Sequence, residues 1–387
     1  MTISIIHKVI DIGDTLHRSG CAPYKIEKYV QHYAHKKGLS VVVQATPTSI
    51  NYQFPEEEDR IFIKRVKPTS INLGLLANTI SHINQEEDGA PPEATNYPSW
   101  LIMLANISIP PSFLLLIGST INAIVVSCLL GFLVWLCQLV CQKERVIIVE
   151  FFSAFVVGLT VSLITYLGVD LPIWGVCIAA IILFVPGLSI ANSLECLAFN
   201  DLVSGTSLFG FSLFTFIKLF IGIMIGLDIG DTAWGHTESV ASINEVPQWL
   251  AFIALPLLSL SIGIILNARL IDIVYAFPVT ILGMWGPVLL DFGSGWIVGT
   301  WITTIFITFY GTWLANTLNL TGAIYIVQGI IILVPGSRVL MGATQSLFNE
   351  TLMEMPSVGL SALFIFSAIV AGQITAYSIY PPKKLKL

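Results

Sequence analysis

Hydrophobic and polar positions divide the chain into two unlike parts. In the first hundred residues, apolar side chains recur at helical spacing over 3–19 and again from Pro23, a favourable first-turn residue, to Gly38. Three segments rich in β-branched residues follow, and the helical pattern then returns over 70–86. The predicted strands are 40–45, 48–54 and 60–66, with a hairpin turn at 55–59. The pattern predicts a small α+β domain over residues 1–95.

From Trp100 onward the sequence is almost continuously apolar, which predicts an all-α polytopic membrane domain. Each apolar segment is close to the roughly 20 residues that a helix needs to cross a bilayer. The ten predicted spans are 99–118, 119–141, 146–168, 171–198, 205–229, 248–268, 271–290, 292–315, 319–346 and 357–380. Because Pro110 and Pro111 interrupt the first segment, 99–141 could instead hold one span and an interfacial segment.

One stretch of this apolar region occurs twice. Residues 181–187 and 330–336 both end in Val-Pro-Gly, and each is followed twelve residues later by Phe-Asn and an acidic residue. Both parts of the pattern are displaced by 149 residues. Five spans per copy reverse the direction of the chain, which predicts two inverted repeats of the kind found in many secondary transporters. The predicted repeats are 96–230 and 248–387, joined by an extracytoplasmic loop at 231–247.

The composition agrees with a membrane protein. Of the 387 residues, 55% are hydrophobic and 11% are charged, and the mean hydropathy of +0.82 is too high for a soluble domain of this size. Five of the six cysteines lie in or beside apolar spans, so we expect no disulfide, metal or cofactor. The expected partners are the lipid bilayer, a small molecule and protons, and no nucleic acid is expected. The protein could also form a homo-oligomer. Residues 1–20 show no cleavable signal peptide.

Charge placement predicts the orientation, because Lys and Arg in short loops stay on the cytoplasmic side. With the N-terminal domain inside, the inner loops and tail hold Lys143, Arg145, Arg269, Lys383, Lys384 and Lys386. The outer loops hold only acidic charges, namely Asp170, Asp228, Asp231, Glu238, Glu245, Asp291, Glu350 and Glu354. We therefore expect ten spans in a bacterial inner membrane, with both termini in the cytoplasm.

The two Pro-Gly pairs predict broken helices in spans four and nine, since proline removes a backbone donor and glycine relaxes the chain. A broken helix exposes N–H groups that favour an anion such as a carboxylate. The alternative is an ordinary packing kink. The candidate substrate-binding residues are Pro186, Gly187, Ser189, Asn192, Ser193, Pro335, Gly336, Arg338 and Gln345.

Charged residues in the spans need a partner or a function, because an intramembrane charge costs at least about 2.5 kcal/mol. Arg338 could clamp a carboxylate, or form a salt bridge with a residue such as Glu195. Glu195 could couple transport to protons, or extend to the interface. Lys218 could contact substrate, or pair with an acidic neighbour. Two further possible charge partners are Asp201 and Glu350.

Histidines and enzyme motifs add no catalytic site. Five histidines lie in the N-terminal domain at positions 7, 17, 32, 35 and 82, where solvated surface positions are favoured over a metal site or pH sensor. The sequence lacks H-E-x-x-H, G-x-S-x-G and a Walker-type loop, which argues against a metalloprotease, a serine hydrolase and an ATP-driven pump. We expect no catalytic residues and a transporter rather than an enzyme.

Short motifs along nearly the whole chain resemble the threonine/serine exporter family, which includes the two-subunit succinate exporters. They include Gly13-Asp-Thr-Leu16, Ser19-Gly-Cys-Ala-Pro-Tyr24, Thr46-Pro-Thr48, Tyr97-Pro-Ser-Trp100, Val185-Pro-Gly187, Ser204-Gly205 and Val334-Pro-Gly-Ser337. The resemblance implies a cytoplasmic domain fused to about ten spans that export small amino acids or dicarboxylates with the proton gradient. Similar members often carry arginine shortly after the Ser-Gly, where this chain has Thr206, Ser207 and Leu208.

That departure leaves the substrate open between threonine or serine and a dicarboxylate such as succinate, and Lys218 or Arg338 could supply the missing positive charge. The expected function is secondary export of small carboxylate metabolites, with substrate between spans four and nine. A channel-like or signalling membrane protein with a cytoplasmic sensor domain is the alternative.

Overall fold

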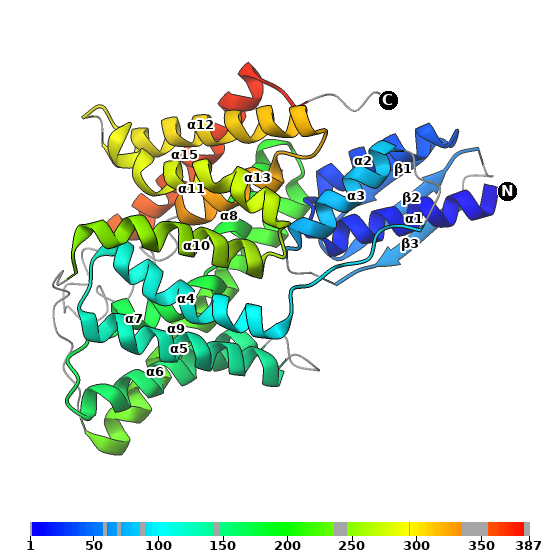
Figure 1. Ribbon diagram of the computed structural model, residues 1–387. Helices are drawn as coiled ribbons and strands as arrows, with labels where there is room; N and C mark the ends of the chain where they lie inside the picture. The colour runs from blue at the N-terminus through cyan, green and yellow to red at the C-terminus, as the bar shows by residue number, and fades with distance from the viewer. Residues whose placement is uncertain are drawn as a thin grey trace.

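A small α+β domain lies at one end of a helical bundle in the computed structural model (Figure 1). The structure describes residues 2–56, 60–67, 71–85, 90–141, 148–235, 246–293, 295–333 and 355–382. In the domain, three helices cover one face of an antiparallel sheet whose strands follow in the order β1, β2, β3. Its elements are α1 (Thr2–Arg18), α2 (Pro23–Lys36), β1 (Val42–Ala45), β2 (Ser49–Phe54), β3 (Arg60–Arg65) and α3 (Leu73–Gln85). The predicted helices and strands are confirmed.

The sheet buries only one of its faces. Ile50, Tyr52 and Phe54 alternate along β2 and are fully buried, whereas Ile61 and Ile63 on β3 are exposed. This alternation is the signature that predicted the strands.

The histidine prediction was wrong for three of the five residues. His17, His32 and His82 are buried, because they lie on helix faces that pack inside the domain or against the bundle, while His7 and His35 are exposed. Burial lowers the pKa of His17, whose Nε2 lies 3.2 Å from the Pro47 carbonyl oxygen. Among the described residues, no three groups are arranged to hold a metal ion.

The bundle consists of apolar helices, which confirms a polytopic helical membrane protein. Among the described residues, six helices are long and apolar enough to cross a bilayer: α4 (Ser99–Ile117), α5 (Ile121–Cys141), α6 (Val149–Tyr166), α9 (Leu202–Trp234), α11 (Leu270–Leu289) and α12 (Trp296–Leu318). Shorter elements are α7 (Ile173–Ile181), η1 (Ile182–Phe184), α8 (Gly187–Ala198), η2 (Gln248–Leu250), α10 (Ala251–Ile265) and α13 (Ala323–Leu333), and the last helix is α15 (Met355–Ile379).

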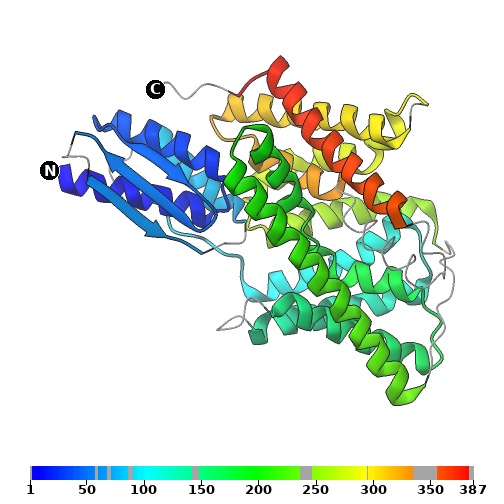
Figure 2. The same ribbon diagram turned by 180° about the vertical axis from the view of Figure 1, so that it is seen from behind.

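Helix pairing follows the same scheme in the two parts of the bundle. Helix α6 packs along α9 and α12 packs along α15, while α5 contacts α6 and α11 contacts α12. Helices α9 and α15 lie on the same face of the bundle (Figure 2). The first helices of the two parts, α4 and α10, pack against each other. Helix α4 continues through Pro110 and Pro111, and α5 is a separate long helix, so 99–141 holds two helices.

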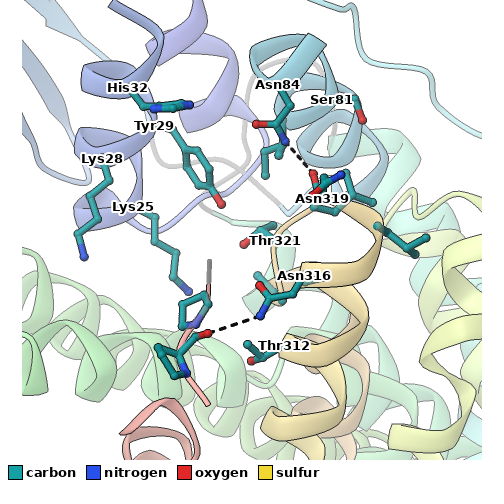
Figure 3. Close-up of a pocket in the computed structure, with 18 of the residues that line it drawn as sticks. Lys25, Lys28, Tyr29, His32, Ser81, Asn84, Thr312, Asn316, Asn319 and Thr321 are labelled. Atoms are coloured by element: carbon teal, nitrogen blue, oxygen red, sulfur yellow. Dashed lines mark hydrogen bonds between the residues drawn. The ribbon is translucent and has the colours of Figure 1, made fainter. Parts of the chain in front are cut away.

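The N-terminal domain docks on the turns at one end of the bundle. The N–H groups of Leu73 and Gly74 at the start of α3 each donate to a carbonyl oxygen of the α10–α11 turn at 2.9 Å. A side chain at Gly74 would collide with the Asn267 carbonyl oxygen, so this approach requires glycine. At the other end of α3, Asn84 Nδ2 donates to the Asn319 carbonyl oxygen at 2.7 Å (Figure 3).

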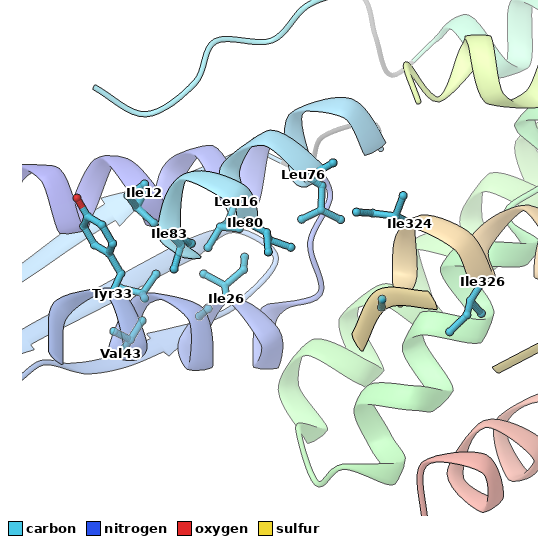
Figure 4. Close-up of a cluster of buried hydrophobic side chains, with 14 of the residues drawn as sticks. Ile12, Leu16, Ile26, Tyr33, Val43, Leu76, Ile80, Ile83, Ile324 and Ile326 are labelled. Atoms are coloured by element: carbon cyan, nitrogen blue, oxygen red, sulfur yellow. The ribbon is translucent and has the colours of Figure 1, made fainter. Parts of the chain in front are cut away.

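The apolar core of the domain continues into the bundle (Figure 4). Ile12, Leu16, Ile26 and Ile80 are buried inside the domain, and Leu76 on α3 extends the cluster to Ile324 and Ile326 on α13. Since one continuous apolar cluster joins the two parts, the domain is held to the bundle by burial as well as by hydrogen bonds.

Candidate functional site

The fourth apolar segment is broken at the first Pro-Gly pair. Helix α7 ends at Ile181, a 3₁₀ turn follows to Phe184, and α8 starts at Gly187 after two non-helical residues. Pro186 is buried before α8, and its carbonyl oxygen accepts the first helical bond from Ile190 N at 3.0 Å. The N–H groups of the first turn of α8 have no carbonyl of a preceding helical turn to bind. The predicted helix break is confirmed.

The polar residues after the break have different surroundings. Ser189 and Asn192 are half-buried, whereas Ser193 is fully buried and donates to the Gly205 carbonyl oxygen at 2.6 Å. This bond marks a close crossing of α8 and α9, since a side chain at Gly205 would lie 2.6 Å from Leu197. Asp201 accepts from Ser204 N at 3.2 Å and caps α9. Ser193 and Asp201 thus have structural partners, and Ser189 and Asn192 are the more available polar side chains.

An apolar cluster brings the break next to the second part of the bundle. Ile182 and Leu183 pack with Ile109 on α4, Leu258 on α10 and Ile331 on α13 in one cluster. Ile331 lies 149 residues after Ile182, and Leu258 lies 149 residues after Ile109. Corresponding positions of the two sequence copies therefore meet at one place.

Glu195 joins α8 to the N-terminal domain. Its carboxylate is only 5% exposed, and it accepts from Tyr24 Oη at 2.6 Å and from Lys25 Nζ at 3.3 Å. Burial disfavours the charge of Lys25, but the Glu195 carboxylate together with Tyr24, Tyr377 and Cys21 raises the pKa of this lysine above its usual range. Tyr24 also stacks on Phe199 with ring centroids 5.2 Å apart. The sequence could not identify this partner, because Lys25 lies 170 residues away in another domain.

Lys218 has an acidic neighbour on the adjacent helix. Its ammonium group forms an ion pair with Glu150 at the start of α6. This ion pair engages the Lys218 charge, for which the sequence had left two roles open: contact with substrate or pairing with an acidic neighbour. The remaining predicted residues, Pro335, Gly336, Arg338, Gln345 and Glu350, lie outside the described residues.

Helix α12 carries a polar inner face that the sequence analysis missed. Five of its threonines are at most 2% exposed: Thr300, Thr303, Thr304, Thr308 and Thr312. Thr304 donates to the Thr300 carbonyl oxygen at 2.8 Å, but the other four hydroxyls have no hydrogen-bond partner within the described part of the chain. Gln373 on α15 is also buried, and its Oε1 has no hydrogen-bond partner among the residues that the structure describes. The four-residue spacing of Thr300, Thr304, Thr308 and Thr312 could have revealed this face.

A large cavity lies where the N-terminal domain meets the bundle (Figure 3). Its volume is about 1020 Å³, and its walls are α2, α3, the turn between α12 and α13, and the end of α15. Lys25, Lys28, His32 and Lys36 line it from one face of α2. Thr312 lies on the opposite wall, so the polar face of α12 reaches this cavity.

Comparison with known proteins identifies the family. The profile of the family described as "Putative threonine/serine exporter" (ThrE) matches residues 7–230, which is more than half of the chain. The match covers the N-terminal domain, the broken helix and α9 up to Gly230. No curated protein and no solved structure matches the chain. The extent of the family match shows that this chain belongs to the threonine/serine exporter family.

Proposed function

We propose that this protein is a secondary active exporter of small carboxylate metabolites, threonine and serine first, that uses the proton gradient across a bacterial inner membrane. Membership of the exporter family supports export of an amino acid. The observation that carries the transport mechanism is the meeting of corresponding residues of the two sequence copies at the helix break. Substrate sites of secondary transporters commonly form at such repeat interfaces.

The helix boundaries support two inverted halves. Helices α4, α5, α6, α7 and α9 each have a counterpart whose first residue lies within four residues of the 149-residue displacement. The counterparts are α10, α11, α12, α13 and α15. Because each half holds an odd number of spans, the second half runs in the opposite direction through the membrane. One half then moves against the other to open the site to alternate sides.

The docking of the N-terminal domain supports a cytoplasmic location for both termini. The domain contacts Glu195, the turn at Leu266 and Asn267, and the turn at Asn319. Charge placement assigns all three regions to the inner side independently of these contacts. The C-terminal end at Pro381 and Pro382 lines the same cavity as the domain.

In this proposal, the substrate carboxylate binds the free N–H groups at the helix breaks and Arg338. Ser189 and Asn192 line the site in the first half, with Gln345 in the second. The unpaired threonine hydroxyls of α12 support a polar route between this site and the cytoplasm, because buried hydroxyls without a partner are costly unless they bind water or substrate. Glu195 is the proposed coupling group, since its protonation would weaken its bonds to Tyr24 and Lys25.

Counterflow in proteoliposomes tests the proposal with labelled threonine, serine and succinate, with and without an imposed pH gradient. We expect saturable threonine or serine exchange that the gradient accelerates. Succinate exchange without threonine exchange would identify a dicarboxylate as the substrate. The basic cavity favours this alternative. Absence of transport for all three substrates in folded protein, or a conductance that does not saturate, would reject the exporter.

The carboxylate clamp has its own test. Arg338→Ala should weaken substrate binding by more than about tenfold, because it removes a charge-assisted pair. Arg338→Lys should recover part of this loss, since lysine keeps the charge without the planar fork. Unchanged affinity in both variants would reject the clamp.

A further inference from the structure

The cavity between the N-terminal domain and the bundle has an uneven distribution of charge. Four basic side chains line it, at positions 25, 28, 32 and 36 of one helix. Spacing of three or four residues places them on one face of α2. Among the described lining residues there is no aspartate or glutamate, and the one carboxylate at its edge, Glu195, is engaged by Tyr24 and Lys25. Since Glu195 neutralises Lys25, the excess positive charge of the described wall comes from Lys28 and Lys36.

The opposite wall offers uncharged polar groups. Thr312, Asn316 and Thr321 contribute hydroxyls and an amide from the end of α12 and the following turn (Figure 3). The Thr312 side chain is 2% exposed, and its hydroxyl has no partner among the described residues. A buried polar group without a partner costs about 1–3 kcal/mol, so a ligand or water that binds this hydroxyl is favoured. The cavity thus combines ammonium groups on one side with a hydroxyl that needs a partner on the other.

We propose that this cavity is a binding site for a cytosolic anion that carries two or more carboxylate or phosphate groups. Two anionic groups match the basic face of α2, while hydroxyl or carbonyl oxygens of the ligand reach Thr312 and its neighbours. A zwitterionic amino acid fits this wall poorly, because its own ammonium group would be repelled by the exposed ammonium group of Lys28. The site is therefore distinct from the proposed threonine or serine site at the helix breaks, and it bridges the domain and the bundle.

Lys28 provides the sharpest test, because it is exposed on α2 and its removal leaves no buried charge. Binding of citrate, succinate and inorganic pyrophosphate to the full chain is measured by calorimetry in neutral phosphatidylcholine nanodiscs, with threonine and serine as zwitterionic comparisons. We expect saturable binding of citrate or pyrophosphate that weakens with added salt. Lys28→Glu should reduce this affinity by about tenfold or more, and Lys28→Arg should retain it.

The matched control is Lys64→Glu, which changes the same charge in the same domain. Lys64 lies on β3 and pairs with Asp14 at 3.3 Å, outside the cavity lining. Thr312→Val tests the opposite wall and should weaken binding with Lys28 intact. Equal losses for Lys28→Glu and Lys64→Glu, threonine binding as tight as citrate binding, or no anion binding by the unaltered protein would overturn the proposal.

Two further measurements complete the test. One distinguishes a lipid headgroup from a soluble metabolite as the source of the anion, and the other distinguishes this proposal from the exporter proposal. If phosphatidylglycerol nanodiscs block citrate binding, the occupant is a lipid headgroup with a single phosphate, which would overturn the assignment to a cytosolic anion with two or more anionic groups. If these nanodiscs leave citrate binding unchanged, the ligand is a soluble metabolite. Threonine transport is measured in parallel, so loss of transport with retained citrate binding would reject the exporter proposal and leave this site intact.

Discussion

Helices α6 and α12 occupy corresponding places in the two parts of the bundle but have unlike inner surfaces. Each packs along the last helix of its own part, α9 or α15. The buried face of α12 carries five threonines, whereas the buried face of α6 carries two serines, Ser153 and Ser162, among alanine, valine and glycine. The two helices therefore share a packing arrangement, while the buried face of α12 holds more hydroxyl groups.

Ion pairs and close glycine contacts occur in both parts; in the second part Arg269 pairs with Asp272, and Gly372 on α15 lies close to α12. The first part holds the ion pairs Glu195 with Lys25 and Lys218 with Glu150, and α9 approaches α6 closely at Gly222. Buried hydroxyls without a partner among the described residues also occur in both parts: Ser112, Ser119, Ser153 and Ser204 in the first, and Thr300, Thr303, Thr308 and Thr312 in the second. The two parts differ chiefly in the number of such hydroxyls on one helix, since α12 holds four of them, and we expect α12 to contribute more to a polar route than α6.

The largest effect is expected from filling the close contact in the first part. A Cβ atom at Gly222 would lie 2.6 Å from the Phe151 carbonyl oxygen, so Gly222→Leu should destabilise the fold by more than about 3 kcal/mol. Size-exclusion profiles and thermal unfolding in detergent would measure the loss. Gly210→Leu on the same helix is the control, because no atom lies within 4 Å of its Cβ position. Gly372→Leu on α15 should cost a similar amount, since a Cβ atom there would lie 2.7 Å from the Trp301 carbonyl oxygen; a loss at 222 no larger than the loss at 210 would contradict the prediction.

The second largest effect is expected at the ion pair that holds the N-terminal domain against α8. Glu195→Gln keeps the shape of the side chain but leaves Lys25 without its counter-charge, and we expect a loss of about 2 kcal/mol. A double-mutant cycle with Lys25→Gln, followed by thermal unfolding, isolates the pair. The double variant should be more stable than the sum of the two single losses predicts. Additive losses would mean that the pair does not couple the domain to α8.

A third prediction concerns the polar face of α12 and separates stability from transport. Thr308→Val replaces an unpaired hydroxyl by a methyl group of similar size, so stability should stay constant or rise. Transport should fall by about tenfold if this hydroxyl binds substrate or water on the route. Thr160→Val on α6 is the control, because the Thr160 hydroxyl already donates to the Val156 carbonyl oxygen at 2.7 Å. Unchanged counterflow for Thr308→Val would remove α12 from the route.

Local patterns were sufficient for much of the fold. The strands of the N-terminal domain follow from alternation, and the break before α8 follows from the Val-Pro-Gly sequence. The same reasoning was less useful for Pro110 and Pro111, where α4 stays helical. There the prolines are buried in the bundle, where neighbouring helices can compensate for the missing backbone donors.

The parts of the site that the sequence missed depend on contacts between distant segments. Glu195 meets Lys25, and the cavity brings α2 opposite the turn after α12. The threonines of α12 recur at a regular spacing in the sequence, but they carry no charge that would mark them as unusual. In a membrane helix, a threonine hydroxyl usually donates to a carbonyl oxygen of the preceding turn. Only the absence of such bonds among the described residues distinguishes Thr300 and Thr308 from Thr160.

The smallest effect is expected at the first helix break, where Ser189 corresponds to Arg338 in the second copy. Ser189 is half-buried and uncharged, so Ser189→Ala removes at most one neutral hydrogen bond and should change substrate affinity less than about fivefold. Arg338→Ala should cost more, because it removes a charged partner of the carboxylate. Both affinities come from counterflow at varied threonine concentration. If Ser189→Ala proved as harmful as Arg338→Ala, the first part would bind substrate as directly as the second.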